Sequence, residues 1–222
     1  MSLASFIDHT ILKPTTILAE IETVCAEAIE WNFAAVCVPP YYVYEAASRL
    51  QGKVSNVATV IGFPFGYSHY NAKVEETIKA VGSGADEIDF VINLAALKNN
   101  DLAYLETEIS TLLVAKKTAR IKVIVESGIL SEEELIRCCK LYAHYPIDFM
   151  KTSTGYAEKG ASVEAVRTMR SQLPATIQIK ASGGIRDAVF ATQLIEAGAT
   201  RLGCSASVAI VKSEAREQAK GY

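Results

Sequence analysis

In residues 148–154 (DFMKTST) a short apolar run is followed by small polar residues, and this pattern decides the fold. The apolar part is typical of a buried β-strand, and Lys151 follows it directly, before the small polar residues of a loop. A helical pattern precedes the run in residues 131–145, and another follows it in residues 162–173. The stretch therefore predicts a strand between two helices, with polar side chains where the strand ends.

The same alternation of strand and helix patterns runs along the whole chain. Eight short segments have the pattern of strands: 6–12, 33–38, 56–63, 87–92, 121–127, 148–154, 177–183 and 201–206. Amphipathic helical segments between them include 17–31, 131–145, 162–173 and 187–199. Successive strands start about 23 to 34 residues apart, the size of one strand, one helix and their loops. We therefore expect an α/β fold, a closed (β/α)₈ TIM barrel, although 222 residues is short for this type.

The helical segments carry start and stop signals. Ser131 and Glu134 have the spacing of a capping box, and Gly198 ends the segment 187–199. The segment 17–31 has an apolar face that we expect to pack on the strands. This face consists of Ile21, Val24, Cys25, Ala28 and Ile29.

An open, doubly wound parallel sheet is the competing architecture. No GxGxxG motif follows the first strands, which argues against its dinucleotide-binding version. No linker or low-complexity stretch divides the chain, and half of its residues are hydrophobic, enough for one core. We expect a single domain over residues 1–222.

Composition argues against several function classes. The net charge of −3 offers no basic field for nucleic acid, and no apolar run is long enough to span a bilayer. The first residues, MSLASFIDHTILKP, lack the pattern of a secretory signal. The five cysteines form no CxxC pair, and the three histidines are not at metal-ligand spacing. We expect a cytoplasmic protein with reduced thiols and with neither nucleic acid nor membrane as a partner.

Ionisable residues interrupt four consecutive predicted strands: Asp89, Lys122, Lys151 and Lys180. Any one of them alone is better explained by an outward side chain or by a structural ion pair. In a TIM barrel, however, inward and outward residues alternate, and chemistry occurs at the C-terminal ends of the strands. Because a buried charge is costly unless it is paired, four such neighbours favour a site inside the barrel.

Lys151 and Lys180 would lie on adjacent strands, about 4.8 Å apart. Two ammonium groups at roughly 5–6 Å repel by roughly 3 kcal/mol at an effective dielectric of about 20, which corresponds to about two pKa units. Desolvation acts in the same direction, whereas the carboxylate of Asp89 opposes both. The pattern predicts one neutral amine that attacks carbonyls, one cation, and one carboxylate that moves protons.

Glycine-rich loops follow the last three strands, at residues 151–155, 181–186 and 203–207. Glycines let backbone N–H groups approach an anion, and a helix N-terminus adds its dipole. Each loop alone is equally explained as a tight turn. Two of them follow strands 7 and 8, where TIM barrels often bind phosphate, so together they predict a phosphate site.

Seven motifs extend this pattern over nearly the whole chain. They are IDHTILKPT (7–15), AAVCVPP (34–40), GFPFGYS (62–68), GADEIDFVIN (84–93), IKVIVESG (121–128), DFMKTSTGY (148–156) and IKASGGIR (179–186). In this order they resemble the deoxyribose-phosphate aldolase family, class I (Schiff-base) aldolases of deoxynucleoside breakdown. The order of ADEID, KTSTG and KASGGIR makes the resemblance highly specific.

The resemblance implies reversible cleavage of 2-deoxy-D-ribose 5-phosphate to D-glyceraldehyde 3-phosphate and acetaldehyde. It implies that Lys151 forms the Schiff base, that Lys180 lowers its pKa and helps to move protons, and that Asp89 donates and accepts protons through water. It implies no metal and no other cofactor, because the imine on Lys151 takes up the electrons. The ligands would be a phosphosugar and aldehydes, and a homodimer or homotetramer is compatible with the sequence.

Further positions match the family more loosely. Asp8 and Lys122 match polar positions that tune the site, and Cys37 matches a strand-end cysteine to which we assign no role. The phosphate-holding positions are Gly155, Gly183, Gly184, Gly203 and Ser205.

Three positions at the phosphate end and at the end of the chain need separate mention. Some members have a lysine where this chain has Tyr156, and some have a second serine where it has Ala206. Some also have a terminal tyrosine that reaches the site; for Tyr222 a frayed end is the simpler interpretation.

Two other functions stay open. Another Schiff-base barrel aldolase, acting on a longer sugar phosphate or on a keto acid, would use the same lysine chemistry, and a substrate panel separates the two. A non-catalytic sugar-phosphate sensor could keep the barrel, but a sensor has no need for Lys151, Lys180 and Asp89 together.

Overall fold

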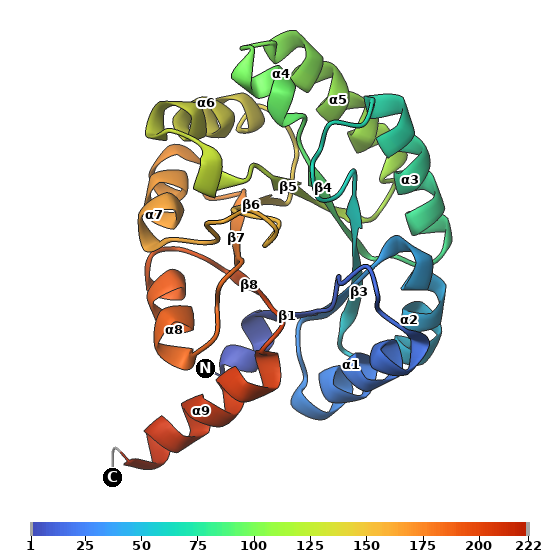
Figure 1. The fold of residues 1–222 in the computed structure, drawn as a ribbon, viewed down its shortest axis with the longest axis vertical. Helices are drawn as coiled ribbons and strands as arrows, with labels where there is room; N and C mark the ends of the chain where they lie inside the picture. Colours follow the sequence, from blue (N-terminus) through green and yellow to red (C-terminus); the bar gives the residue numbers. More distant parts are fainter. Residues whose placement is uncertain (1, 221–222) are drawn as a thin grey trace.

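The computed structural model describes residues 2–220, and side chains up to residue 215. Eight parallel strands close into a barrel in sequence order (Figure 1). The strands are β1 (Ile7–Thr10), β2 (Ala35–Val38), β3 (Asn56–Ile61), β4 (Glu87–Val91), β5 (Arg120–Ile124), β6 (Phe149–Lys151), β7 (Gln178–Ser182) and β8 (Arg201–Cys204). Because β1 also pairs with β8, the described sheet closes on itself. The predicted (β/α)₈ barrel is confirmed, and the open-sheet alternative is wrong.

Helices surround the strands as an outer ring (Figure 1). The α-helices are α1 (Leu18–Trp31), α2 (Val43–Leu50), α3 (Tyr70–Gly82), α4 (Leu94–Lys98), α5 (Leu102–Ala115), α6 (Glu132–Tyr142), α7 (Val163–Gln172), α8 (Ala188–Glu196) and α9 (Ser207–Lys220). Short 3₁₀ helices are η1 (Leu3–Phe6), η2 (Pro40–Tyr42) and η3 (Ser127–Ile129). The four helices named from the sequence are α1, α6, α7 and α8.

The predicted helix signals are largely confirmed. The backbone N–H of Glu134 donates to Ser131 Oγ at 3.2 Å, and the Ser131 N–H donates to Glu134 Oε2 at 2.8 Å, so the capping box forms. The apolar face of α1 is buried except for Ile29, which is exposed. Ile29 lies at the margin of the helical stripe, where side chains turn toward solvent.

The apolar core lies mainly between the strands and the helices. A second, smaller apolar cluster consists of Ala35, Cys37, Ala58 and Val60, with Leu12 and Phe63 packed against it. This cluster is built on β2 and β3. The other strands direct charged side chains toward the barrel interior, so the interior has one apolar side and one charged side.

One buried ion pair lies outside the barrel, between Lys73 of α3 and Glu108 of α5, with 2.6 Å between Lys73 Nζ and Glu108 Oε1. Lys73 Nζ also donates to the carbonyl oxygens of Gly66 and Val91, at 2.6 and 2.7 Å. Glu108 Oε2 accepts from the backbone N–H of Asn93 at 3.1 Å. The pair therefore ties two helices to the loops that follow β3 and β4.

Replacing Glu108 by glutamine should destabilise the protein, because the Lys73 ammonium group would stay buried without its counter-charge. We expect the free energy of unfolding, measured by urea denaturation, to fall by about 3 kcal/mol. Glu106→Gln, on the exposed side of the same helix, is the matched control and should change it by less than about 0.5 kcal/mol. Equal stability of the two variants would contradict a structural role for the pair.

Candidate active site

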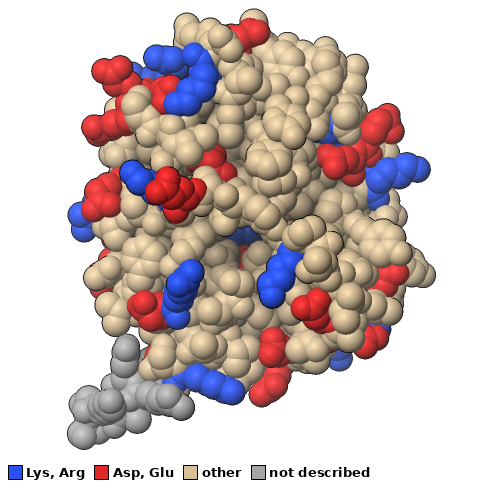
Figure 2. Space-filling view, viewed as in Figure 1, with Lys and Arg blue, Asp and Glu red and all other residues tan. Residues whose placement is uncertain are grey.

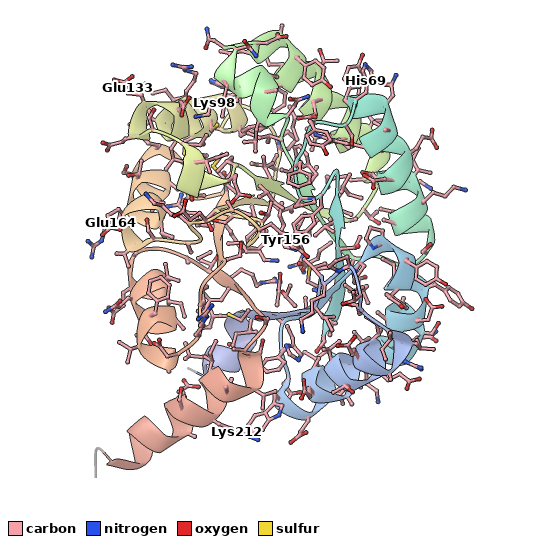
Figure 3. All side chains as sticks on the ribbon, in the orientation of Figure 1. His69, Lys98, Glu133, Tyr156, Glu164 and Lys212 are labelled. Atoms are coloured by element: carbon pink, nitrogen blue, oxygen red, sulfur yellow. The ribbon has the colours of Figure 1, made fainter. Side chains whose placement is uncertain are left out.

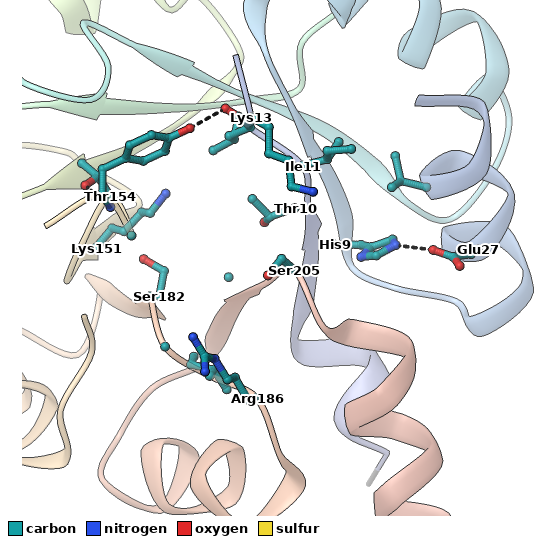
Figure 4. Close-up of a pocket in the computed structure, with 18 residues that line it drawn as sticks. His9, Thr10, Ile11, Lys13, Glu27, Lys151, Thr154, Ser182, Arg186 and Ser205 are labelled. Atoms are coloured by element: carbon teal, nitrogen blue, oxygen red, sulfur yellow. Dashed lines mark hydrogen bonds and ion pairs between the residues drawn. The ribbon is translucent and has the colours of Figure 1, made fainter. Parts of the chain in front are cut away.

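A cavity of about 520 Å³ lies at the C-terminal ends of the strands. Its lining comes mainly from the ends of β1, β6, β7 and β8 and from the loops that follow them (Figure 4). The space-filling view shows this face hollowed near its centre (Figure 2). The cavity is therefore where a TIM barrel places its chemistry.

Seven buried ionisable side chains from the strands form one connected network inside the barrel. Three are carboxylates and four are cations: Asp8, Glu87 and Asp89, and Lys122, Lys151, Lys180 and Arg201. The strand register explains their proximity, because Asp89 pairs with Lys122, and Lys151 with Lys180, on neighbouring strands. The structure thus brings together the four ionisable residues that the strand pattern singled out.

The carboxylate of Asp89 contacts three lysines. Its Oδ1 lies 2.6 Å from Lys122 Nζ, and its Oδ2 lies 2.8 Å from Lys151 Nζ and 2.7 Å from Lys180 Nζ. Burial alone would raise the pKa of Asp89, but the three ammonium groups outweigh it and hold this pKa well below the usual value. Asp89 is therefore ionised at neutral pH.

A second set of ion pairs lies deeper in the barrel. Lys180 Nζ also donates to Asp8, and Lys122 Nζ lies 2.6 Å from Glu87 Oε2. Burial alone would lower the pKa of Lys122 and Lys180, but the neighbouring carboxylates outweigh it and raise both values. These two lysines therefore stay charged.

Arg201 completes this deeper set, with its Nη1 2.6 Å from Asp8 Oδ1 and 3.1 Å from Glu87 Oε2. The sequence analysis missed Arg201 and Glu87. The signal was present, because Glu87 lies two residues before Asp89 and Arg201 two residues before Gly203, on the same faces of their strands. The predicted positions Asp8 and Lys122 belong to the same network. Like Asp89 and Lys180, they do not line the cavity, which Lys151 alone of the predicted catalytic residues does.

Lys151 differs from the other cations of the network. Its Nζ contacts one carboxylate, Asp89, and its side chain points into the cavity (Figure 4). Burial lowers the pKa of Lys151. The Asp89 carboxylate raises this pKa, whereas repulsion from the Lys180 ammonium group lowers it further. The net result is a pKa below the usual value for lysine. Among the seven buried groups the cations outnumber the carboxylates by one, so loss of the Lys151 proton would balance their charges. The exposed Arg120 also contacts Glu87, with 3.3 Å between Arg120 Nη1 and Glu87 Oε1. The arrangement favours a neutral amine at the cavity floor, which is a nucleophile for carbonyl groups.

The five predicted phosphate residues all line this cavity: Gly155, Gly183, Gly184, Gly203 and Ser205. Gly183 has φ +88°, which side chains rarely adopt. Gly203 lies in β8 rather than in a loop, and a Cβ there would come within 3.2 Å of Lys180 Cε and 2.8 Å of Ser182 Cβ. Glycine at 203 therefore makes room for Lys180.

Tyr156, one of the departures from the family pattern, lines the cavity and lies over the middle of the barrel, whereas Lys98 and Glu164 lie on the outer helices (Figure 3). Its hydroxyl donates to the carbonyl oxygen of Leu12 at 2.8 Å. Its ring meets the ring of Phe63 edge-on, with 5.3 Å between the centroids. Tyr156 thus connects the loop after β6 with the loop after β1 across the cavity.

The remaining sequence predictions have varied outcomes. Cys37 belongs to the small apolar cluster of β2 and β3, and burial raises the pKa of its thiol. Ala206 packs, partly buried, against the main core. Tyr222 lies outside the described residues. Lys13 and Arg186, which the sequence analysis did not select, line the cavity, and both belong to quoted motifs.

Neither a membrane-spanning helix nor a cluster of metal ligands occurs among the described residues. No helix between residues 2 and 220 is long and apolar enough to cross a bilayer. Within the same part of the chain, no three His, Cys, Asp or Glu side chains are grouped so that they would hold a metal ion.

Comparison with known proteins agrees with this geometry. The family model described as DeoC/LacD family aldolase matches residues 3–213. The chain belongs to the DeoC/LacD aldolase family. A deoxyribose-phosphate aldolase of Clostridium perfringens is 46% identical over 213 residues, which cover 96% of this chain and 95% of that protein.

Solved structures of aldolases share the fold. An aldolase named QR15 superposes with a TM-score of 0.93 at 38% identity, covering 98% of this chain and 97% of that one. A tetrameric deoxyribose phosphate aldolase from Aeropyrum pernix superposes with a TM-score of 0.87 at 28% identity, covering 96% and 91% of the two chains.

Replacing Lys180 by methionine should raise the pKa of Lys151, because it removes a repelling cation and leaves Asp89 Oδ2 to Lys151 alone. A lysine attacks carbonyls as the neutral amine, so its reactivity is present above its pKa and is lost as the pH falls. We expect the acidic limb of imine formation to move to higher pH, measured by borohydride trapping of acetaldehyde across a pH series. Lys79→Met, on the surface of α3, should leave the limb in place. A Lys180 variant whose limb does not move would show that the two lysines are not coupled.

Proposed function

We propose that this protein is a deoxyribose-phosphate aldolase that reversibly cleaves 2-deoxy-D-ribose 5-phosphate to D-glyceraldehyde 3-phosphate and acetaldehyde. The observation that carries the proposal is Lys151, a buried lysine with a lowered pKa at the floor of a cavity, in contact with Asp89. Membership of the aldolase family supports the reaction class, and the name of the Clostridium perfringens relative supports the substrate.

The first step is attack on the open-chain sugar. The neutral Nζ of Lys151 adds to C1, and the carbonyl oxygen takes up a proton, which gives a carbinolamine. Loss of water from the carbinolamine leaves a protonated imine. We assign proton donation in this step to Lys180, because it is protonated and shares Asp89 Oδ2 with Lys151, and we assign the acceptor role to the ionised Asp89.

The second step breaks the bond between C2 and C3. A base removes the proton of the C3 hydroxyl, and we assign this role to Asp89 acting through a water molecule. The electron pair of the C2–C3 bond moves to the iminium nitrogen, and glyceraldehyde 3-phosphate leaves. The enamine is then protonated at C2, and hydrolysis of the resulting imine releases acetaldehyde and regenerates Lys151. The iminium acts as the electron sink, so the proposal needs no metal and no other cofactor.

The phosphate would lie at the other end of the cavity, against the loops after β7 and β8 and the start of α9. Glycine-rich backbone and a helix N-terminus suit an anion there. Arg186 and Lys13, which line the same cavity, would supply positive charge (Figure 4). Their presence offers a reason why this chain can have Tyr156 where some family members have a lysine.

We also propose that residues 1–222 form one aldolase domain, that the protein is a homo-oligomer, and that it works in the cytoplasm. The pairing of β1 with β8 joins the two ends of the chain and supports a single domain. The tetrameric Aeropyrum pernix relative supports a homo-oligomer. Five buried free cysteines suit a reducing compartment.

Borohydride trapping tests the nucleophile. After incubation with acetaldehyde and reduction, peptide mapping by mass spectrometry should find an ethyl group on Lys151. Lys151→Ala should give neither the adduct nor detectable turnover, whereas the surface variant Lys79→Ala should give both at the level of the parent protein. An ethyl group scattered over surface lysines, or turnover by Lys151→Ala, would refute the assignment.

A substrate panel tests the reaction. We expect 2-deoxyribose 5-phosphate to be cleaved with a higher kcat/KM than longer sugar phosphates or keto acids, measured by coupled detection of the aldehyde product. Preference for a longer substrate would point to the related aldolase activity. Calorimetric binding of the phosphosugar without turnover would favour the sensor.

A further inference from the structure

His9 has no part in the proposed mechanism, although it lies beside Asp8 in the motif IDHTILKPT. Side chains alternate along β1, so His9 points away from the barrel interior, toward α1 and the start of α9. His9 is 4% exposed, and together with Glu27 it lines the end of the cavity beyond Ser205 (Figure 4). A buried histidine at this place needs an explanation.

The imidazole of His9 connects three elements of the fold. Its Nδ1 lies 2.9 Å from Ser207 Oγ on α9, and its Nε2 lies 2.7 Å from Glu27 Oε2 on α1. Ser207 Oγ in turn lies 2.9 Å from the carbonyl oxygen of Cys204, the last residue of β8. The ring also packs against Phe33, with 5.1 Å between the centroids.

The number of available protons decides how these contacts are satisfied. The Ser207 hydroxyl has one proton, which it donates to the carbonyl oxygen of Cys204, so its oxygen is left to accept. Nδ1 of His9 then donates to Ser207 Oγ, and Nε2 faces the Glu27 carboxyl group. His9 therefore restrains the Ser207 side chain in the orientation that reaches Cys204.

The consequence of these contacts is geometric. The hydrogen bond from Ser207 to Cys204 closes a tight turn around Ser205 and Ala206. Ser205 lines the cavity, and Ser207 is the first residue of α9 and fully buried. The backbone N–H groups at the start of a helix have no intrahelical partners and suit an anion. A fixed Ser207 therefore fixes the amide groups at the phosphate end.

We propose that His9 is a positioning residue for the phosphate end of the cavity. Through Ser207, it holds the turn of residues 204–207 in the orientation that accepts a phosphate monoester. The inference rests on the proposed function, because it requires that the phosphate of the substrate lies against this turn.

The test compares 2-deoxyribose 5-phosphate with unphosphorylated 2-deoxyribose in the parent protein and in His9→Leu, which has no group that can donate to Ser207. Loss of that hydrogen bond should raise KM for the phosphorylated substrate by about tenfold. Its kcat, and kcat/KM for 2-deoxyribose, should stay within about twofold, because Lys151 and its ion pairs are untouched. Inhibition by inorganic phosphate should weaken by about the same tenfold factor.

Two further variants make the test decisive. Ser207→Ala removes the acceptor of the Nδ1–H group and leaves the pair of His9 and Glu27 intact, so it should change KM in the same direction. It decides the question if His9→Leu does not fold. The exposed His144→Leu is the matched control and should keep the parental constants.

An unchanged KM in both variants, or an equal loss with both substrates, would overturn the inference and leave His9 a purely structural role. The proposed function fails in a different way. A parent protein that gives no ethyl adduct on Lys151 and does not cleave 2-deoxyribose 5-phosphate would refute that function, and the inference with it. An active parent with unaffected variants refutes the inference alone.

Discussion

The carboxylate of Asp89 lies between three buried ammonium groups, and the rest of the site depends on this shared ion pairing. The seven buried side chains of the network include one more cation than carboxylates. In a poorly solvated interior an unbalanced charge is costly, and the cation with the fewest carboxylate contacts gives up its proton most readily. That cation is Lys151, which is also the one that reaches the cavity. The same balance of buried charges would therefore supply the nucleophile of the proposed reaction.

This balance of buried charges is possible because the barrel interior has an apolar side and a charged side. Small apolar residues of β2 and β3 fill one side of the interior, so the charged residues are concentrated on the other strands. Parallel register aligns Asp89 with Lys122 and Lys151 with Lys180, and the second pair lies two residues further along its strands. The Asp89 carboxylate lies between the two pairs and contacts lysines from three strands. Outside the barrel, the pair of Lys73 and Glu108 anchors loops by the same principle, but with every charge matched.

The alternation of strand residues made much of this structure predictable. It predicted the eight strands, and the period of two assigned Asp89, Lys122, Lys151 and Lys180 each to one face of its strand. Alternation alone does not say which face is inward; the presence of four ionisable residues on consecutive strands favoured the interior.

The contacts between distant parts of the chain could not be predicted from the sequence. Arg201 bonds Asp8 across 193 positions, and the Tyr156 hydroxyl bonds the Leu12 carbonyl across 144. Such pairs follow from closure of the barrel, which no local pattern encodes. Their distance along the chain also bears on biosynthesis. During translation Asp8 emerges first, and its partners Lys180 and Arg201 emerge last, so the network cannot be completed on a partly made chain. A nascent chain would therefore carry Lys151 as an ordinary protonated lysine, and its reactivity toward cellular aldehydes would arise only when the finished polypeptide closes.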